Sequence, residues 1–216
     1  TRKGRAGATP AVFRRKGRWS MTAPEQAGGE YEQEKRVLMA VELAGYTKAF
    51  QTHEDASVAR FVDEYYALCE RVISKHRGSI VKFMGDGCLA SFPADAANDA
   101  LGAALALERA LDDLSTAHQL RLSLSANLHL AVVVEGQFGA GASRRRDVIG
   151  RGVNQTFLLG RGPGIRISEP LYRQLPNSAR SAWNKHKPPA IYHLTPGSEG
   201  ALEGLSKDSG TNTVRW

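Results

Sequence analysis

The sequence predicts an α+β domain in which helices pack on one face of an antiparallel sheet. Residues 57–75 repeat apolar side chains at helical spacing, and residues 94–114 form a second long, Ala/Leu-rich helical stretch. A Gly-Asp-Gly sequence at 85–87, between two short apolar runs, is a strong β-hairpin signal. The resulting order β-α-β-β-α-β, followed by further strands, is that of a ferredoxin-like core with additions.

Each remaining element follows from its local pattern. The continuous apolar run Val-Leu-Met-Ala-Val at 37–41 is typical of a buried strand, and Gly45 ends it. A strand-rich stretch is expected at 120–134, with glycines 136, 139 and 141 marking bends after it. The other strands are expected at 79–83, 88–92, 147–149, 165–168 and 191–194, with a short helix at 153–159.

The charge is distributed unevenly along the 216 residues. The formal net charge is +7, but residues 1–20 contain seven basic and no acidic side chains. The other 196 residues carry 22 of each sign, so the body of the chain does not have the composition of a nucleic-acid-binding domain. We expect a domain at 30–195 between a basic flexible tail at 1–29 and a flexible tail at 196–216. Met21 is a candidate start, in which case residues 1–20 are upstream sequence.

Two further classes of protein are excluded by pattern. No stretch approaches the roughly 18 consecutive apolar residues of a membrane helix, and no apolar run follows the basic tail as in a secretory signal. The two cysteines, Cys69 and Cys88, lack metal-binding spacing and lie in apolar surroundings, so we expect buried thiols and a cytoplasmic location.

Two acidic residues are expected to meet at one edge of the sheet. Glu42 lies at the end of the first strand, and Asp86 lies at the tip of the hairpin. Two adjacent carboxylates repel each other unless a cation joins them, and Mg²⁺ takes such oxygen ligands together with phosphates. The alternative is a surface glutamate and an ordinary turn aspartate.

Three segments resemble motifs of the class III nucleotidyl cyclases, in that family's order over about residues 35–195. Residues 41–47 resemble its first metal motif, with Glu42 where the family has Asp. Residues 82–92, from Lys-x-x-Gly-Asp-Gly onwards, resemble its hairpin, and residues 147–154 resemble its third motif. The chain is thus similar to a divergent bacterial-type member with the nucleotidyl cyclase fold. Further matching positions are His129, Gly136, Gly139 and 167–169.

The resemblance implies conversion of ATP into 3′,5′-cyclic AMP and pyrophosphate by a homodimer whose sites use both chains. Two Mg²⁺ or Mn²⁺ ions would bind Glu42 and Asp86, with the Leu43 carbonyl as a further ligand. One ion would activate the 3′-hydroxyl and the other would hold the triphosphate. The backbone amides that would bind phosphate are those of Ala44, Gly45, Tyr46 and Thr47.

The resemblance also implies a choice of base. Lys82 and Asp147 occupy the family's two base-recognition positions. An ammonium donates to adenine N1 and a carboxylate accepts from the exocyclic amine, whereas the guanine carbonyl would face the carboxylate of Asp147. The sequence therefore favours ATP. The alternatives are a solvated strand lysine and a charge at a strand edge.

One catalytic position departs from the family. Asn154 matches the ribose-orienting Asn, but Leu158 stands where the family has a transition-state Arg. Arg161 is a candidate replacement, although Gly160 is expected to end the helix before it. Loss of the Arg could cost ~10²–10³ in rate, by analogy with loss of one oxyanion donor. Other basic candidates are Arg151 and the run Arg144, Arg145 and Arg146, although we prefer a solvated hairpin for the run. Either Lys185 or Lys187 is expected to bind phosphate, and we select Lys187.

The function predicted is therefore a metal-dependent adenylate cyclase of low activity. The rival prediction is a catalytically weak or inactive cyclase-homology domain that binds nucleotide or serves as a dimerising regulatory partner. Leu158 favours this rival, whereas Lys82, Asp86, Asp147 and Asn154 oppose it. A third hypothesis, binding of nucleic acid by the basic tail, predicts salt-dependent affinity that is lost on deleting residues 1–20.

Overall fold

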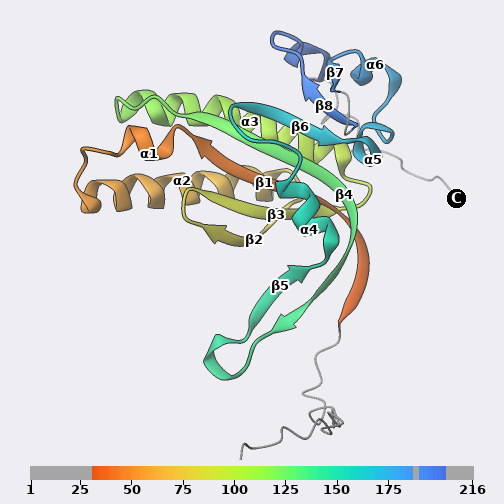
Figure 1. Cartoon of the computed structure of the whole chain (residues 1–216), viewed down its shortest axis with the longest axis horizontal. Coiled ribbons are helices and arrows are strands. Elements are labelled where there is room, and N and C mark those ends of the chain that lie inside the picture. Colours follow the sequence, from red (N-terminus) through yellow and green to blue (C-terminus); the bar gives the residue numbers. More distant parts are fainter. Residues whose placement is uncertain (1–30, 187–189, 203–216) are drawn as a thin grey trace, which may run out of the picture.

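A computed structural model describes residues 31–186 and 190–202 of the chain (Figure 1). Its strands form one sheet in the order β2-β3-β1-β4-β6-β8-β7, and β5 pairs with the C-terminal end of β4. Neighbouring strands are antiparallel apart from β4 and β6, which run parallel. The strands are β1 (Glu32–Ala44), β2 (Ser79–Met84), β3 (Gly87–Pro93), β4 (Ser123–Phe138), β5 (Arg145–Ile149), β6 (Gly164–Ser168), β7 (Trp183–His186) and β8 (Ile191–Leu194).

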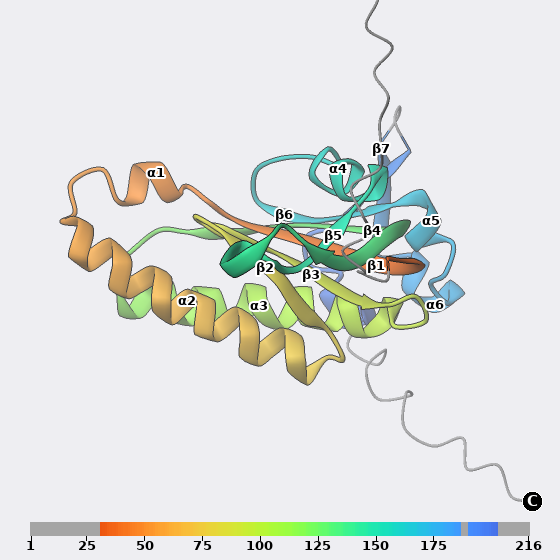
Figure 2. The same ribbon diagram turned by 90° about the horizontal axis from the view of Figure 1, so that it is seen from below.

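The helices lie on both faces of this sheet. Figure 2 shows the two long helices, α2 and α3, side by side beneath it and α4 above it. The predicted α+β class is confirmed, but the expectation that all helices cover one face is wrong for α4. The helices are α1 (Tyr46–Ala49), α2 (Asp55–Lys75), α3 (Ala97–Ala117), α4 (Arg151–Phe157), α5 (Glu169–Tyr172) and α6 (Asn177–Arg180), with 3₁₀ turns η1 (Gly141–Ser143) and η2 (Glu199–Leu202).

β1 contributes to two hydrophobic cores because its side chains alternate between the faces. Val37, Met39 and Val41 are buried in the larger core with α2 and α3. Leu38 and Ala40 are buried in a smaller core, against which residues of α4 pack. A strand covered on both faces has no polar alternation, which explains the continuous apolar run that predicted it.

The boundaries of several elements differ from the prediction, and β7 was not predicted. Two of the differences concern the bend after β4 and the C-terminal limit of the domain. Gly136 lies inside β4, where it pairs with Asp147, so the expected bend there is wrong; the chain turns at Gly139 and Gly141, whose φ angles are positive. The described chain also continues past residue 195 into η2, where Leu202 is only 4% exposed, so the packed domain includes this turn. The predicted tail at 1–29 and the rest of the C-terminal tail lie outside the described residues.

The membrane exclusion and the cysteine prediction can both be compared with the structure. None of the helices in residues 31–186 and 190–202 combines the length and apolar character needed to span a bilayer. Cys69 on α2 and Cys88 on β3 are both buried free thiols, as predicted.

Gly87 is a site where the fold requires glycine. A Cβ built there would lie 2.1 Å from the Val41 carbonyl oxygen of β1, so the two backbones approach more closely than a side chain permits. We expect Gly87→Ala to lower the free energy of unfolding by about 2–3 kcal/mol, measured by urea denaturation. The control is Gly85→Ala, which meets open space and carries only the cost of its positive φ, about 1 kcal/mol. Equal stabilities of the two variants would contradict this account.

Candidate nucleotide and metal site

The end of β1 and the tip of the β2–β3 hairpin lie side by side, as the sequence predicted. Glu42 pairs with Gly87 in the β1–β3 ladder, and the backbone N–H of Leu43 donates to the carbonyl oxygen of Asp86 at 3.0 Å. The residues predicted as metal ligands are therefore neighbours in the backbone, with Glu42 near the end of β1 and Asp86 in the turn between β2 and β3. Metal binding itself stays a prediction.

The negative charge of Asp86 acts on the hydroxyl groups of Tyr46 and Tyr66 at this edge of the sheet. Burial, and then the negative charge of Asp86, raise the pKa of Tyr46 above its ordinary value. The donor set fits a hard divalent cation, because Mg²⁺ is commonly held by one or two carboxylates plus substrate phosphates. The described residues contain no cluster of three or more His, Cys, Asp or Glu suited to a metal, so phosphate oxygens or water would complete the coordination.

The chain after β1 forms the predicted backbone turn. Gly45 has φ +92° and precedes α1, and its carbonyl accepts a hydrogen bond from the Ala49 N–H at 2.9 Å. The first N–H groups of a helix lack intrahelical acceptors, so the amides of Tyr46 and Thr47 are available to an anion. The backbone amide of Leu43, in contrast, is already bonded to Asp86.

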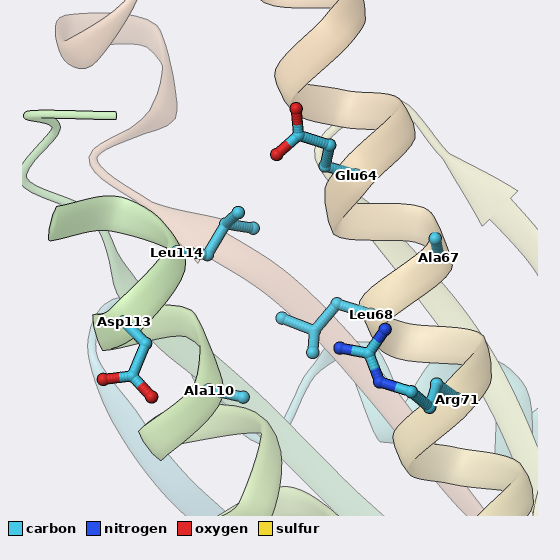
Figure 3. A pocket seen from close by; sticks show the side chains of 7 residues that line it. All are labelled: Glu64, Ala67, Leu68, Arg71, Ala110, Asp113 and Leu114. Carbon is cyan, nitrogen blue, oxygen red and sulfur yellow. The ribbon is translucent and has the colours of Figure 1, made fainter. Parts of the chain in front are cut away.

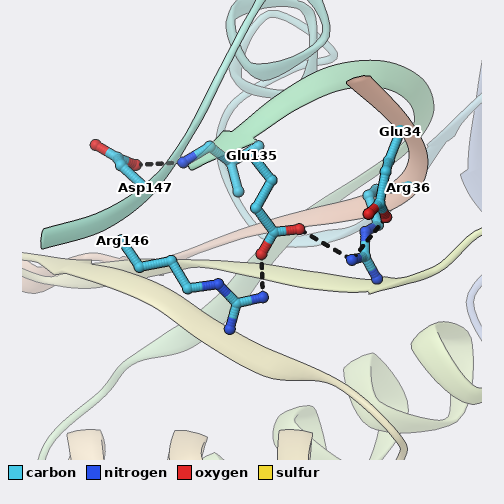
Figure 4. A network of polar contacts seen from close by, with 6 residues as sticks. Glu34, Arg36, Glu135, Arg146 and Asp147 are labelled. Atoms are coloured by element: carbon cyan, nitrogen blue, oxygen red, sulfur yellow. Dashed lines mark hydrogen bonds and ion pairs between the residues drawn. The ribbon is translucent and has the colours of Figure 1, made fainter. Parts of the chain in front are cut away.

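Lys82 and Asp147, 65 residues apart in the sequence, form an ion pair. Figure 4 labels Asp147 of this pair. The Lys82 ammonium Nζ lies 2.9 Å from Oδ1 and 3.0 Å from Oδ2 of Asp147, and the N–H of Val148 donates to Oδ1 at 2.8 Å. β2 and β5 are not paired in the sheet, so the contact bridges two separate strands. The two residues predicted to recognise the base are thus brought together, with complementary donor and acceptor.

A second carboxylate cluster next to this pair was not predicted. Glu135 of β4 is 9% exposed and accepts hydrogen bonds from Arg36 of β1, at 2.9 Å, and from Arg146 of β5 (Figure 4). Arg36 also contacts Glu34 at 2.7 Å. Through Arg146, the cluster ties β5, the strand that contains Asp147, to β4 and β1. Its partners are up to 99 residues apart, so only the β1–β4 register, which local patterns do not contain, would have revealed it.

α4 presents Asn154 and Leu158 to solvent. Its inner side packs Val153 and Phe157 on the smaller core, and Gln155 bonds the buried His129 of β4 at 3.2 Å. Burial lowers the pKa of His129, so the imidazole is neutral near pH 7. Asn154 is exposed, and Leu158, one turn later, is 78% exposed. The expected arrangement of these two positions on one surface is present.

Arg161 does not share that helical surface. α4 ends at Phe157, and Arg161 lies in an exposed loop before β6. Buried Arg166, unnoticed in the sequence, holds this loop by donating to the carbonyl oxygens of Arg161, Gly162, Pro163 and Gly164 at 2.8–3.2 Å. Burial lowers the pKa of Arg166 from its ordinary value. Local spacing contains no signal for this contact, because it depends on the loop conformation.

Lys187, the predicted phosphate ligand, lies outside the described residues. Its alternative, Lys185, is exposed on β7, with its ammonium 5.9 Å from the centre of the Tyr192 ring. β7 and β2 occupy opposite ends of the sheet order, so a single copy does not bring Lys185 to the hairpin.

A groove between α2 and α3 lies apart from these residues (Figure 3). Leu68 and Leu114 form part of its apolar lining, with Glu64, Arg71 and Asp113 at its sides. Its lining residues belong to α2 and α3 and include none of the predicted site residues.

Comparison with known proteins finds distant relatives in sequence and similar solved structures. No family model matches. The chain is 27% identical over 154 residues to an adenylate cyclase of Anabaena cylindrica, covering 65% of this chain and 31% of that protein. It is 29% identical over 138 residues to an uncharacterised protein of Mycobacterium tuberculosis, covering 62% of this chain and 25% of that protein. The chain thus spans between a quarter and a third of these curated relatives.

Solved structures show the fold. The guanylyl cyclase Cya2 superposes with a TM-score of 0.68 at 21% identity, over 76% of this chain and 92% of that one. The adenylyl cyclase CyaB from P. aeruginosa superposes with a TM-score of 0.68 at 19% identity, over 77% of this chain and 96% of that one. A class III adenylyl cyclase-like ATP-binding protein from Pseudomonas aeruginosa superposes with a TM-score of 0.65 at 20% identity, over 81% of this chain and 41% of that one. The chain has the fold of the class III adenylyl and guanylyl cyclase catalytic domains. In sequence it is similar to an adenylate cyclase.

Proposed function

We propose that this domain is a nucleotide cyclase that converts ATP into 3′,5′-cyclic AMP and pyrophosphate. The observation that carries the proposal is the ion pair of Lys82 with Asp147, a matched donor and acceptor next to the hairpin that presents Asp86. On the cyclase fold this pair has the chemistry that recognises adenine. The chain matches only 31% and 25% of the length of the two curated relatives. The activity of any longer protein that contains this domain is therefore also a proposal.

The residues would divide the work as follows. The 3′-hydroxyl loses its proton to solvent as its oxygen attacks the α-phosphorus, the bond from that phosphorus to the oxygen bridging to the β-phosphate breaks, and pyrophosphate leaves with the electron pair. Glu42 and Asp86 would hold two Mg²⁺ or Mn²⁺ ions, which when bound would lower the pKa of the 3′-hydroxyl and neutralise the triphosphate. Asn154 would orient the ribose, and the amides at 44–47 would bind phosphate.

Assembly as a homodimer is part of this proposal. The Lys82–Asp147 pair would open toward the base, with the Lys82 ammonium donating to N1 and Asp147 accepting from the amine. α4 projects from the face of the sheet opposite α2 and α3, and Lys185 lies at the far edge from the hairpin (Figures 1 and 2). A second copy could bring such separated groups to one nucleotide. A cytoplasmic location also stays a prediction.

Exchanging the base-recognition pair should change the substrate. We expect Lys82→Glu with Asp147→Cys to shift the ATP-to-GTP ratio of kcat/KM by roughly 10² toward GTP, because the carboxylate then accepts from guanine N1 and N2. Each single variant serves as a control, since it leaves one charge of the pair without its partner. Steady-state kinetics with both nucleotides measure the ratio. An unchanged ratio in the double variant would refute the assigned roles.

A second candidate function is nucleotide binding without turnover. Leu158 favours it, because no cation stands at the exposed position one turn after Asn154. The structural likeness to a cyclase-like ATP-binding protein favours it too. Saturable ATP binding with no cyclic product, at high protein concentration and with either metal, would select this function.

The experiment that tests turnover is chromatographic detection of cyclic AMP and pyrophosphate after incubation with ATP and Mn²⁺ or Mg²⁺. Asp86→Ala sets the background because it removes one of the two carboxylates. We expect product above that background with at least one metal. Product no higher than the Asp86→Ala background would eliminate the enzymatic proposal.

A further inference from the structure

The tip of the β2–β3 hairpin is held from its outer side by α2. The ring of Tyr66 stacks on that of Phe83, with centroids 4.0 Å apart and planes at 14°. The Tyr66 hydroxyl donates to the carbonyl oxygen of Gly85 at 2.6 Å. Gly85 directly precedes Asp86, so this contact acts on the peptide that leads into the proposed metal ligand.

The hairpin has few other restraints at this point. β2 is an edge strand whose pairing with β3 is irregular between Ile80 and Lys82. Gly85 has φ +62°, and nothing lies within 4 Å of the place where its Cβ would be. On the inner side, the Leu43 N–H of β1 donates to the Asp86 carbonyl at 3.0 Å. The tip is therefore clamped between β1 and α2.

The hydroxyl of Tyr66 is suited to donating a hydrogen bond at neutral pH. Burial raises the pKa of Tyr66, and the neighbouring hydroxyl of Tyr46 and the charge of Asp86 add to this shift. The hydroxyl therefore remains a hydrogen-bond donor at neutral pH.

We propose that Tyr66 is a positioning residue that keeps Asp86 beside Glu42 and thereby sets the affinity of this pair for a divalent cation. Its hydroxyl holds the Gly85 carbonyl, and its ring fixes the direction of the turn through Phe83. The inference rests on the proposed function, because it assigns Tyr66 to the metal site of the cyclase. In this role Tyr66 acts through Gly85 and Phe83 and is not itself a metal ligand.

The test uses Tyr66→Phe, which keeps the stacked ring and removes only the hydroxyl. The matched control is Tyr65→Phe, one residue earlier on α2, because that hydroxyl is buried and makes no hydrogen bond to residues 84–87, all of which the structure describes. Hydrogen exchange of the Leu43 amide reports on the clamp, since this amide donates to Asp86. We expect exchange to be roughly 3- to 10-fold faster in Tyr66→Phe and unchanged in Tyr65→Phe.

The second readout is binding of Mn²⁺ alone, followed by the electron paramagnetic resonance signal of the free ion. Tyr66→Phe should weaken binding roughly 2- to 10-fold and Tyr65→Phe should not. Wild-type exchange and Mn²⁺ affinity in Tyr66→Phe would overturn the inference. If the wild type binds Mn²⁺ no better than Asp86→Ala, the proposed metal site fails instead, and the exchange rates still decide whether Tyr66 holds the hairpin.

Discussion

Leu158→Arg is expected to raise the kcat for cyclic AMP formation by roughly 10²-fold, with little change in KM. Leu158 is 78% exposed at the end of α4 and lies one turn beyond Asn154. Positions four apart on a helix lie on the same side, so a guanidinium there would reach the region that Asn154 faces. A positioned cation that meets charge developing in the transition state is worth about 10²–10³ in rate. Initial rates over a range of ATP concentrations measure both constants.

Leu158→Gln is the matched control for this gain. It replaces the same exposed apolar side chain with a polar one of similar size but adds no charge. Because the leucine is exposed, neither variant should change the thermal midpoint by more than a few degrees. Equal activities of the Arg and Gln variants would contradict the idea that a missing charge limits turnover.

Asp86→Asn is expected to lower cyclic AMP formation by roughly 10³-fold. The amide is nearly isosteric, and the contact to the Leu43 N–H uses the backbone carbonyl of residue 86, so the hairpin should keep its fold. The loss is that of one of two carboxylates proposed to hold cations, whose electrostatic contribution is several kcal/mol. Rates at saturating Mn²⁺, with the thermal midpoint as a check on folding, measure the effect.

Asp63→Asn is the control for charge, because Asp63 is exposed on α2 and touches none of the proposed site. It should retain wild-type activity. If Asp86→Asn turned over ATP as fast as Asp63→Asn, then Asp86 would not be a metal ligand.

The sequence predicted the elements that have a local signal. The hairpin at Gly85–Gly87 and the long helices could be found because their patterns depend on near neighbours. α4 was found but placed on the wrong face, since a seven-residue helix contains too little periodicity to show which core it covers. Gly136 was taken for a bend because a glycine within a long strand cannot be distinguished locally from one that ends it.

The site residues that belong to the family motifs could be predicted from the sequence. The residues that act through tertiary contacts could not. The adjacency of Glu42 and Asp86 follows from a strand end beside a hairpin tip. The clamp by Tyr66 and the loop contacts of Arg166 depend on side-chain directions that no spacing specifies. The sequence did indicate that the helix ends before Arg161, and the structure bears this out, although α4 ends at Phe157, ahead of Gly160.

The most direct measurement supplies ATP and GTP together at equal concentration with Mn²⁺ and quantifies both cyclic products by mass spectrometry. The Lys82–Asp147 pair predicts that cyclic AMP exceeds cyclic GMP in the wild type. Asp86→Asn should reduce both products toward background. An excess of cyclic GMP would contradict the base assignment. The absence of both products at high enzyme concentration would contradict the cyclase account itself.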